Sequence, residues 1–504
     1  MMEKSKYEKI MDITTKRGFF YPSAEIYGAK AGFWTYGHLG TKIKHKWEGL
    51  WRKFFLSLDT NFYEIDDVNI MPKKVFESSG HLKNFTDPLT ECEKCHFRFR
   101  ADQLAEDELK IDVAGLREDA LTKLIRDNKL KCPKCKGSLM DVKFFNMMFD
   151  IRVGAVNEEI MYLRPESAQS PYMAFRREFE ATRRKLPLGL AVIGRAFRNE
   201  ISPRQGFFRL REFTQAELQI FFDAEKINEH ENWSKINNYN LIVFSDKKAK
   251  KISCKEMNEK LKIPKFYIYY MAKVQQFYLD VLKIPENRLR FRELGQEERA
   301  FYNKIHFDIE INLETLGGWK EVGGCHFRGT HDLGGHQTGS GTNLEITVDE
   351  EGRVKRFLPS VLELSFGVDR NIWALIDIFY KEEKERTTFS FTPQLSPIDA
   401  AVFPLVNKDK LPDISENIFM ELFRSGFSVL YDNSGSIGKR YRRQDEIGTN
   451  ICITVDFDSL NKNDITIRDR DTMKQIRLKN KDLKETLNKL RSGAKLSDFG
   501  KFID

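Results

Sequence analysis

The sequence predicts a multidomain protein of mixed α+β and α/β class, and three observations carry this prediction. Residues 190–222 consist of two apolar, extended runs around the turn-rich stretch ISPRQG, which is typical of an antiparallel hairpin. Two C-x2-C pairs, CEKC and CPKC, bracket a helical stretch and indicate a small metal-binding insert. From about residue 394 onward, strand and helix patterns alternate as they do in a βαβ unit.

Composition and charge are those of a globular protein with two or three domains. Of the 504 residues, 41% are hydrophobic and 31% are charged, and the net charge of +8 permits a polyanionic partner without requiring one. No apolar run approaches the length of a membrane span, and the first residues, MMEKSKYEKIMD, lack the apolar core of a secretory signal. We therefore expect a cytoplasmic protein with no membrane association.

The first domain is expected to cover residues 1–393. After a Gly-rich loop, an amphipathic helix is expected over 41–55, with one apolar stripe formed by Ile43, Trp47, Leu50, Trp51 and Phe54. Two inserts are expected, a cysteine-rich one over 88–145 and a helical and mixed one over 224–293. The domain ends in a helix whose buried stripe is formed by Val368, Ile372, Leu375, Ile376 and Phe379.

The second domain is expected to cover residues 394–504 and to be α/β. DAAVFPLV predicts a buried strand, DISENIFMELFRSGF a helix and SVLYDN a second strand. NICITVDF and the alternating ITIRDRDT predict further strands.

Four of the seven cysteines form the two C-x2-C pairs: Cys92, Cys95, Cys132 and Cys135. In a chain with no export signal, this pattern indicates Zn²⁺ rather than disulfides. Four thiolates leave no open coordination position, so the zinc would be structural. Redox or vestigial cysteines are the alternative interpretation. The other three cysteines are scattered singly.

The predicted hairpin is rich in charge. Five arginines alternate with aromatic residues and two glutamates: Arg195, Arg198, Arg204, Arg209 and Arg211, with Glu200 and Glu212. Guanidinium groups match phosphate oxygens, a glutamate can accept from an exocyclic amine, and Phe213 can stack on a base. The chain has neither GxxxxGK[ST] nor a GxGxxG loop that opens a helix, so the hairpin suits a nucleoside triphosphate held without a phosphate loop. An ordinary hairpin with charged outward positions is the alternative.

Several motifs resemble those of class II aminoacyl-tRNA synthetases. FRNE…FRLREF resembles their motif 2, and LELSFGVDR resembles their motif 3. YLRPESAQ, SGHLKNFTDPLTEC, CHFRFRAD, GWKEVGG and GKRYRRQDEIGT are similar to segments of the homodimeric glycyl-tRNA synthetases, in the family's order and over nearly the whole chain. The resemblance implies an antiparallel-sheet catalytic domain with a zinc-ribbon-like insert, followed by a mixed α/β anticodon-binding domain.

The resemblance implies an ATP site with Mg²⁺ on the phosphates. Arg198 would hold the α-phosphate, Glu200 would lie at the adenine end, and Arg370 would flank the adenine and reach the γ-phosphate. These three residues would orient the substrates rather than supply a nucleophile. The implied ATP site consists of Arg198, Asn199, Glu200, Phe208, Arg209, Leu210, Arg211, Glu212, Phe213, Glu321, Val322, Gly367, Val368, Asp369 and Arg370.

The resemblance also implies a site for glycine, which has no side chain to bind. Its ammonium group would lie among Glu166, Glu217 and Glu363, and larger amino acids would be excluded sterically. The implied glycine site consists of Arg100, Glu166, Phe213, Thr214, Gln215, Ala216, Glu217, Glu363, Leu364, Ser365, Phe366 and Gly367. The stretch GGCHFRGTHDLGGHQ keeps Arg328 and Asp332 but differs from the family between them, so no role is assigned to Arg328.

The implied reaction attaches glycine to tRNA(Gly) through a glycyl-adenylate. Lys439, Arg440, Arg442 and Arg443 would contact the anticodon, because unpaired RNA is bound by stacking and by cations on its phosphates. The helix over 41–55 resembles motif 1, which implies a homodimer interface; a helix that packs on its own core is the rival interpretation.

Three other functions are alternatives. A class II synthetase for threonine, proline or serine would carry a different arrangement around RPESAQ. A catalytically inactive, nucleic-acid-binding subunit would be expected to lose the phosphate arginines and ammonium carboxylates, which are all present here. A zinc-ribbon regulator would leave most of the chain unexplained.

Overall fold

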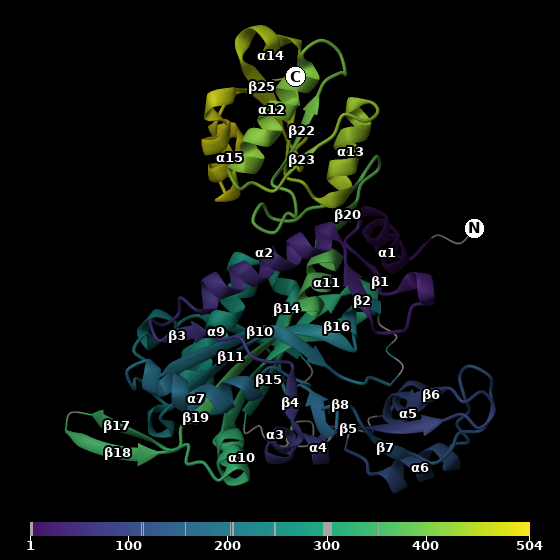
Figure 1. The fold of residues 1–504 in the computed structure, drawn as a ribbon, viewed down its shortest axis with the longest axis vertical. Helices are drawn as coiled ribbons and strands as arrows, with labels where there is room; N and C mark the ends of the chain where they lie inside the picture. The colour runs from purple at the N-terminus through teal and green to yellow at the C-terminus, as the bar shows by residue number, and fades with distance from the viewer. Residues whose placement is uncertain are drawn as a thin grey trace.

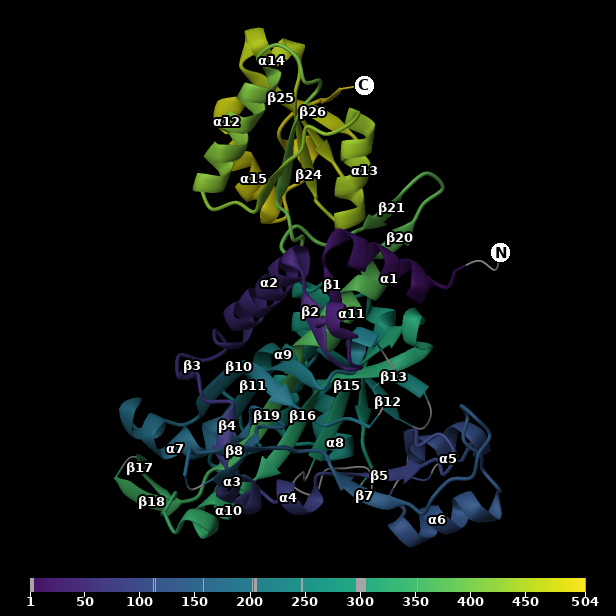
Figure 2. The same cartoon turned by 45° about the vertical axis from the view of Figure 1, so that its right-hand side comes forward.

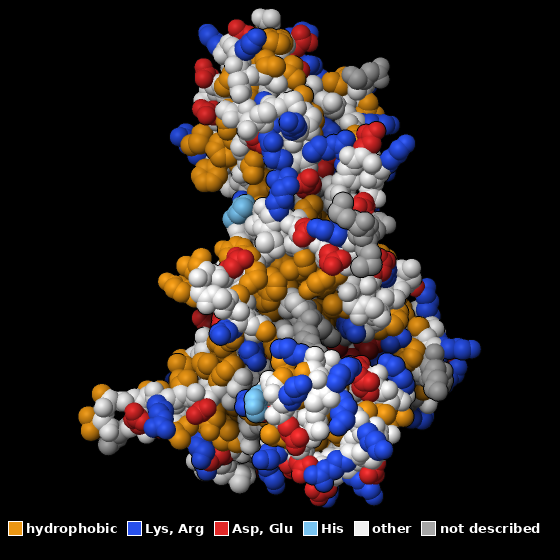
Figure 3. Space-filling model, turned by 90° about the vertical axis from the view of Figure 1, so that its right-hand side faces the viewer, with side chains coloured by type: hydrophobic (Ala, Val, Ile, Leu, Met, Phe, Trp, Pro, Cys, Tyr) orange, Lys and Arg blue, Asp and Glu red, His pale blue; other side chains and the backbone are white. Residues whose placement is uncertain are grey.

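The computed structural model describes residues 4–111, 113, 115–156, 158–201, 203, 206–245, 248–295, 305–350 and 352–503. Arg204 of the predicted hairpin lies outside these residues. The chain forms a large N-terminal body with a smaller C-terminal body at one end (Figure 1), and the space-filling view shows a waist between them (Figure 3). Within the described part of the chain, no helix is long and apolar enough to cross a membrane.

The N-terminal body is built on a nine-stranded sheet in the order β13-β12-β14-β15-β16-β19-β11-β10-β3. Its neighbouring strands are antiparallel except β12–β14 and β10–β3, which are parallel. The strands are β3 (Phe62–Glu64), β10 (Leu188–Phe197), β11 (Glu212–Phe222), β12 (Asn240–Ser245), β13 (Lys248–Ser253), β14 (Leu289–Glu293), β15 (Ile305–Leu313), β16 (Gly318–Gly329) and β19 (Ser360–Gly367). The predicted antiparallel-sheet domain is confirmed.

The predicted hairpin consists of β10 and β11, which pair from Leu188↔Phe221 to Phe197↔Glu212. Successive side chains of a strand point to opposite faces of the sheet. On β11, Ala216 and Leu218 pack into the main core, whereas Glu217 lines a cavity on the opposite face. One strand therefore supplies both the core and the site.

Most helical residues of the main core, on one face of the sheet, come from α2 (His38–Phe55), α9 (Lys265–Gln276) and α11 (Val368–Phe379). The apolar stripe predicted on α2 is part of this core, because Trp47 and Trp51 are fully buried. Trp51 and Phe55 also pack on the ring of Phe366 in β19. The stripe thus packs on the protein's own sheet, as the interpretation of a core-packing helix expects.

Residues 224–293 are helical and mixed, as expected, but they do not form a separate insert. β12, β13 and β14 extend the nine-stranded sheet, and α9 places Tyr267, Ile268 and Met271 in the main core. Between them, α8 (Cys254–Leu261) begins at a capping box of Ser253 and Glu256. This part of the chain completes the sheet at its β13 edge.

Smaller elements complete the N-terminal body. They are α1 (Lys6–Arg17), β1 (Phe20–Pro22), β2 (Trp34–Tyr36), β4 (Ile70–Pro72), α3 (Lys73–Ser78), α4 (His81–Asn84), β8 (Phe149–Val153), β9 (Glu159–Leu163), α7 (Gln169–Ala181), α10 (His331–Ser340), β17 (Ile346–Glu350), β18 (Arg353–Phe357), β20 (Tyr380–Glu382) and β21 (Thr387–Phe389).

The cysteine-rich insert folds as a small module over residues 86–146, which we call the cysteine module. It contains β5 (Thr86–Glu91), β6 (Arg98–Arg100), α5 (Ala101–Leu109), α6 (Glu118–Asp127) and β7 (Lys143–Asn146). β5 lies between β6 and β7 in an antiparallel sheet. The module lies at the end of the molecule away from the C-terminal body (Figure 2).

The C-terminal body is the mixed α/β domain that the sequence predicts. Its six-stranded sheet has the order β23-β22-β24-β25-β26-β27, and β22 is parallel to both β23 and β24. The elements are β22 (Ala400–Pro404), α12 (Leu411–Arg424), β23 (Val429–Tyr431), α13 (Ile437–Ile447), β24 (Ile451–Val455), α14 (Phe457–Lys462), β25 (Asp464–Asp469), β26 (Gln475–Lys479), α15 (Leu483–Arg491) and β27 (Phe502–Ile503). It has its own apolar core, and the ion pair of Lys46 with Asp399, at 2.6 Å, ties it to α2.

Candidate active site

A cavity of about 260 Å³ lies on the face of the nine-stranded sheet opposite the main core. Strands β11, β15, β16 and β19, the start of α11 and the segments that flank the hairpin turn provide its walls. Fifteen residues of the two implied sites line it: Glu166, Arg198, Glu200, Phe208, Arg209, Leu210, Phe213, Gln215, Glu217, Glu321, Glu363, Ser365, Gly367, Asp369 and Arg370. The fold therefore brings motifs that are up to about 200 residues apart in the chain into one cavity.

One end of the cavity is rich in guanidinium groups and aromatic rings. Arg209 forms an ion pair with Glu200, with its Nη2 2.7 Å from Oε2. Arg370 contacts Glu321 across 3.0 Å, and its guanidinium carbon lies 5.4 Å from the centre of the Phe208 ring. Glu321 is exposed, and partial desolvation beside the cavity raises its pKa, but the charges of Arg370 and Arg198 outweigh this and lower the pKa below its usual range.

Arg198 is held differently from the other two arginines. Its Nε donates to the carbonyl of Pro165 over 3.0 Å, and its guanidinium carbon lies 5.2 Å from the Phe213 ring centre and 5.3 Å from that of Phe85. Among the described residues, no carboxylate lies within ion-pair distance of it. Its charge is therefore available to an anion.

The other end of the cavity holds three buried carboxylates. Glu166, Glu217 and Glu363 are 6%, 2% and 3% exposed. Glu217 accepts hydrogen bonds from the hydroxyls of Ser167 and Ser365, both at 2.8 Å. Burial, followed by the charges of Glu363 and Glu166, raises the pKa of Glu217 to about 8. No cationic side chain of the described residues forms an ion pair with Glu217.

Arg328 forms ion pairs with the other two carboxylates, Glu166 and Glu363. Its fully buried guanidinium donates to both oxygens of Asp332 at 2.8 Å, to Glu363 at 2.9 Å and, more weakly, to Glu166 at 3.5 Å. Burial raises the pKa of Glu363, but Arg328 and His326 outweigh it and lower that pKa to about 2. Arg328, to which the sequence assigned no role, is thus the centre of the acidic end.

Two histidines lie on adjacent strands beside these carboxylates. His326 hydrogen-bonds with Glu363, and His306 hydrogen-bonds with Asp308 across 2.9 Å. The two rings meet edge to face, with their centres 4.2 Å apart. Burial lowers the pKa of His306, as does the neighbouring His326.

Ten residues of the implied sites do not line the cavity: Arg100, Asn199, Arg211, Glu212, Thr214, Ala216, Val322, Leu364, Phe366 and Val368. Most follow from strand alternation, because Ala216, Leu364 and Phe366 point into the main core. Arg211 donates to the carbonyls of Glu200 and Ala31 and so holds the hairpin turn. Arg100 belongs to the cysteine module, where it pairs with Asp87 and Asp102.

Six cavity residues were not expected: Leu294, His306, Asp308, Gly323, Gly324 and His326. Leu294 directly follows β14, and the other five belong to β15 or β16. On β15, polar and apolar residues alternate, so that His306 and Asp308 line the cavity while the intervening Phe307 packs into the main core. The polar residues among them, in KIHFDIE and GGCHFRG, were the available signal.

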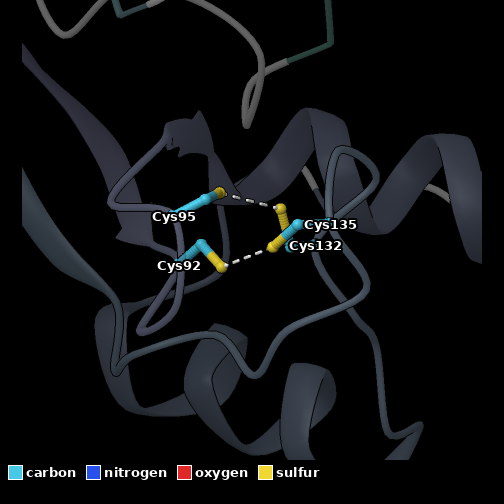
Figure 4. A group of neighbouring side chains, drawn as sticks. All are labelled: Cys92, Cys95, Cys132 and Cys135. Atoms are coloured by element: carbon cyan, nitrogen blue, oxygen red, sulfur yellow. Dashed lines mark hydrogen bonds between the residues drawn. The ribbon is translucent and has the colours of Figure 1, made fainter.

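The four cysteines predicted to bind zinc come together (Figure 4). Cys92 Sγ lies 3.5 Å from Cys135 Sγ, and Cys95 Sγ lies 3.7 Å from Cys132 Sγ. A tetrahedron of thiolates about 2.3 Å from a Zn²⁺ ion has edges of about 3.8 Å, so the sulfurs fit this ion. The backbone N–H groups of Cys95 and Lys94 lower the pKa of Cys92 to about 6, which favours the thiolate.

The four residues expected to contact an anticodon lie on α13. Two of them, Arg440 and Arg443, form hydrogen bonds or ion pairs within the C-terminal body. Arg440 is 2% exposed and donates to the carbonyls of Pro404, Asn433 and Gly435. Arg443 pairs with Asp432 at 2.7 Å, and Arg442 lies beside Glu385. Lys439 is exposed.

Comparison with known proteins agrees with this architecture. Residues 151–379 match the family model of the tRNA synthetase class II core domain (G, H, P, S and T), and residues 399–490 match that of the anticodon binding domain. The chain is 38% identical to a glycine–tRNA ligase of Thermococcus kodakarensis, over 96% of this chain and 98% of the relative. It is 36% identical to that of Pyrococcus furiosus, over 98% and 100%, and 34% identical to that of Methanococcus vannielii, over 94% and 97%. The chain therefore belongs to the glycine–tRNA ligase family of class II aminoacyl-tRNA synthetases.

Proposed function

We propose that the cavity carries out the attachment of glycine to tRNA(Gly), with ATP at the arginine end and glycine at the carboxylate end. The observation that supports this most directly is Glu217, a buried carboxylate with two hydroxyl donors and no cationic partner among the described residues. Such a group is stabilised by an ammonium ion that enters the cavity. The alternative of an inactive subunit has no support, because the phosphate arginines and the carboxylates converge on one cavity.

ATP would bind as its magnesium complex along the arginine end. Arg198 faces the cavity without a carboxylate partner among the described residues and would hold the α-phosphate. Arg370 and Arg209 now pair with Glu321 and Glu200, and ATP phosphates would compete for these guanidinium groups. The rings of Phe208 and Phe213 offer apolar surface for the adenine. Mg²⁺ takes oxygen ligands and would enter with the phosphates.

Glycine would bind with its ammonium group on Glu217, between Ser167 and Ser365. Glu363 and Glu166 share the charge of Arg328, so Glu217 is the carboxylate whose charge is not compensated. The neighbouring sheet surface is tight: a methyl group added at Gly323 or Gly324 would come within 2.4 Å of Ser365 O or 2.3 Å of His326 Nε2. Glycine at these two positions therefore lets the cavity-lining strands lie close together, and exclusion of larger amino acids by this wall is part of the proposal.

In the first step, a carboxylate oxygen of glycine attacks the α-phosphorus, and the bond to pyrophosphate breaks. Arg198 stabilises the negative charge that develops on the α-phosphate oxygens. In the second step, a terminal ribose hydroxyl of tRNA attacks the activated carbonyl and AMP leaves. No side chain becomes covalently attached, so catalysis rests on positioning and electrostatics.

Other assignments belong to the same proposal. The C-terminal body would bind the anticodon, with exposed Lys439 on its surface, and Cys92, Cys95, Cys132 and Cys135 would hold a structural Zn²⁺. The four reduced thiols suit the cytoplasm. A homodimer would cover the edge strand β3 and the segment that follows it, where Tyr63, Val68 and Ile70 are exposed.

The test is ATP–pyrophosphate exchange with each of the twenty amino acids in turn, without tRNA. Exchange stimulated by glycine alone is expected. Stimulation by a different amino acid would retain the adenylate chemistry and overturn the glycine site. No exchange with any amino acid, in folded protein supplied with magnesium, would overturn the proposed reaction.

A further inference from the structure

The cysteine module reaches the arginine end of the cavity through two of its strands. β5 begins directly after Phe85 and leads to Cys92, and β7 follows Cys135 and ends directly before Met147. The two strands pair antiparallel from Leu89↔Lys143 to Thr86↔Asn146. One end of this ribbon therefore carries the sulfur cluster, and the other end carries Phe85 and Met147.

The second end of the ribbon contacts the hairpin turn at Arg198 and Asn199. The ring centre of Phe85 lies 5.3 Å from the guanidinium carbon of Arg198. The amide of Asn199 donates to the carbonyl of Met147 over 2.7 Å, and the amide of Met147 donates to the carbonyl of Phe85 over 3.1 Å. These contacts join the backbone and the side chain of one hairpin segment to the module.

A second contact region lies beside this one. Asp87 on β5 is 7% exposed and pairs with Arg100 at 3.2 Å. Burial raises the pKa of Asp87, and the charges that act on it include those of Glu200 and Arg209. The module thus also lies close to the Glu200–Arg209 pair of the cavity.

Arg198 depends on these contacts for its position. It has no ion pair with a carboxylate among the described residues, and its guanidinium is fixed by the Pro165 carbonyl and by the rings of Phe213 and Phe85. An arginine held by a carbonyl and ring faces keeps its charge for a phosphate. Removal of the Phe85 ring is therefore expected to loosen the orientation of this guanidinium.

We propose that the cysteine module is a positioning element for ATP. The cluster of four cysteine sulfurs fixes one end of the β5–β7 ribbon, and Phe85 and Met147 at its other end position Arg198 and Asn199. This rests on the proposed function of the cavity, in which Arg198 binds a phosphate. Phe85 is a positioning residue, since it acts through Arg198 and does not line the cavity.

The first test replaces the ring. Phe85→Leu is expected to raise the KM for ATP about tenfold in pyrophosphate exchange, while the KM for glycine stays within about twofold. Phe85→Tyr keeps the ring and is expected to restore most of the ATP affinity. Phe144→Leu, a change of the same kind at an exposed position on β7, is the matched control. Equal losses for both substrates, or a loss in Phe144→Leu as large as in Phe85→Leu, would overturn the proposal.

The second test needs no catalysis. Hydrogen exchange is measured on the peptide that contains the Asn199 amide, in the wild type and in Cys92→Ser. Faster exchange is expected there, and unchanged exchange on β11 around Glu217. Cys254→Ala, a buried cysteine on α8, is the control. Unchanged protection of Asn199 in a folded Cys92→Ser protein refutes the coupling. If the wild type shows no pyrophosphate exchange, but Cys92→Ser still loses protection of the Asn199 amide, the proposed function is refuted and the coupling is retained.

Discussion

Arg328 Nη1 donates to Glu363 Oε2 over 2.9 Å, on the same arginine whose Nε and Nη2 bind Asp332. One buried cation thus faces the carboxylates at the acidic end of the cavity, and Glu217 is the one it does not contact in the described structure. The arrangement leaves one carboxyl group, that of Glu217, without a cationic partner among the described residues. This asymmetry prepares the site for one small cation.

Arg198→Ala is expected to abolish glycine-dependent pyrophosphate exchange, a loss of at least about 1000-fold, because the other described arginines that line the cavity, Arg209 and Arg370, each have a carboxylate partner. Circular dichroism and thermal unfolding should remain close to the wild type. Exchange at the wild-type rate would contradict the role given to Arg198.

Glu217→Gln tests the ammonium site and its pH dependence. We expect kcat/KM for glycine to fall about 100-fold at pH 8. In the wild type, the carboxyl has a pKa of about 8, so kcat/KM for glycine should rise with pH up to that value as the negative form becomes populated. The variant should lose this rise.

Folding stability changes in the opposite direction with pH. The pKa of Glu217 is raised in the folded state, so its contribution to stability is full below about 4.5 and is lost as the pH rises through about 8. Urea unfolding of Glu217→Gln should therefore show a smaller decline in the free energy of unfolding between pH 5 and pH 8 than the wild type shows. An identical decline in both proteins would contradict the raised pKa of the buried Glu217 carboxyl.

Arg328→Met is expected to destabilise the protein by about 3–5 kcal/mol, because it leaves Asp332, Glu363 and Glu166 without their shared cation. Urea unfolding measures this loss. Arg126→Met removes an exposed pair with Asp141 and should change stability by less than about 0.5 kcal/mol. If Arg328→Met does not fold, Asp332→Asn provides the milder variant, and wild-type stability of that variant would argue against the network.

Native protein is expected to contain about one zinc ion per chain, measured by plasma mass spectrometry. Chelation should speed hydrogen exchange over residues 86–146, since the module has only small apolar clusters of its own. A zinc content near zero would refute the metal site. The C-terminal body, which has a separate core, should be unaffected.

Two neighbouring cations on α13 should behave differently. Lys439→Ala is expected to weaken tRNA binding, lower the salt dependence of that binding by about one ion and leave stability unchanged. Arg440→Ala should mainly destabilise the C-terminal body, because its buried guanidinium holds three carbonyls. Filter binding at several salt concentrations, together with thermal unfolding, separates the two. These assignments would be reversed if Arg440→Ala weakened tRNA binding more than Lys439→Ala did while both variants kept the wild-type stability.

Local patterns in the sequence are enough to predict the family, the hairpin, the clustered cysteines and fifteen of the residues that line the cavity. These features depend on local pattern: the alternation in TQAELQI, the C-x2-C spacing and the order of charged residues in FRNE. Glu166, Glu217 and Glu363 could be assigned together because each belongs to a recognisable motif.

Other features depend on contacts between residues that are distant in the chain, and only the folded structure shows them. Residues 240–293 joined the main sheet because β14 pairs with β15, which no local pattern indicates. The stripe of α2 packs on its own sheet, and Arg440 turns inward, because burial depends on neighbours rather than on residue type. The role of Arg328 follows from the packing of β16, β19 and α10, which places Glu363 and Asp332 around it. The contribution of a buried charge to the free energy of folding depends on the partners that surround it.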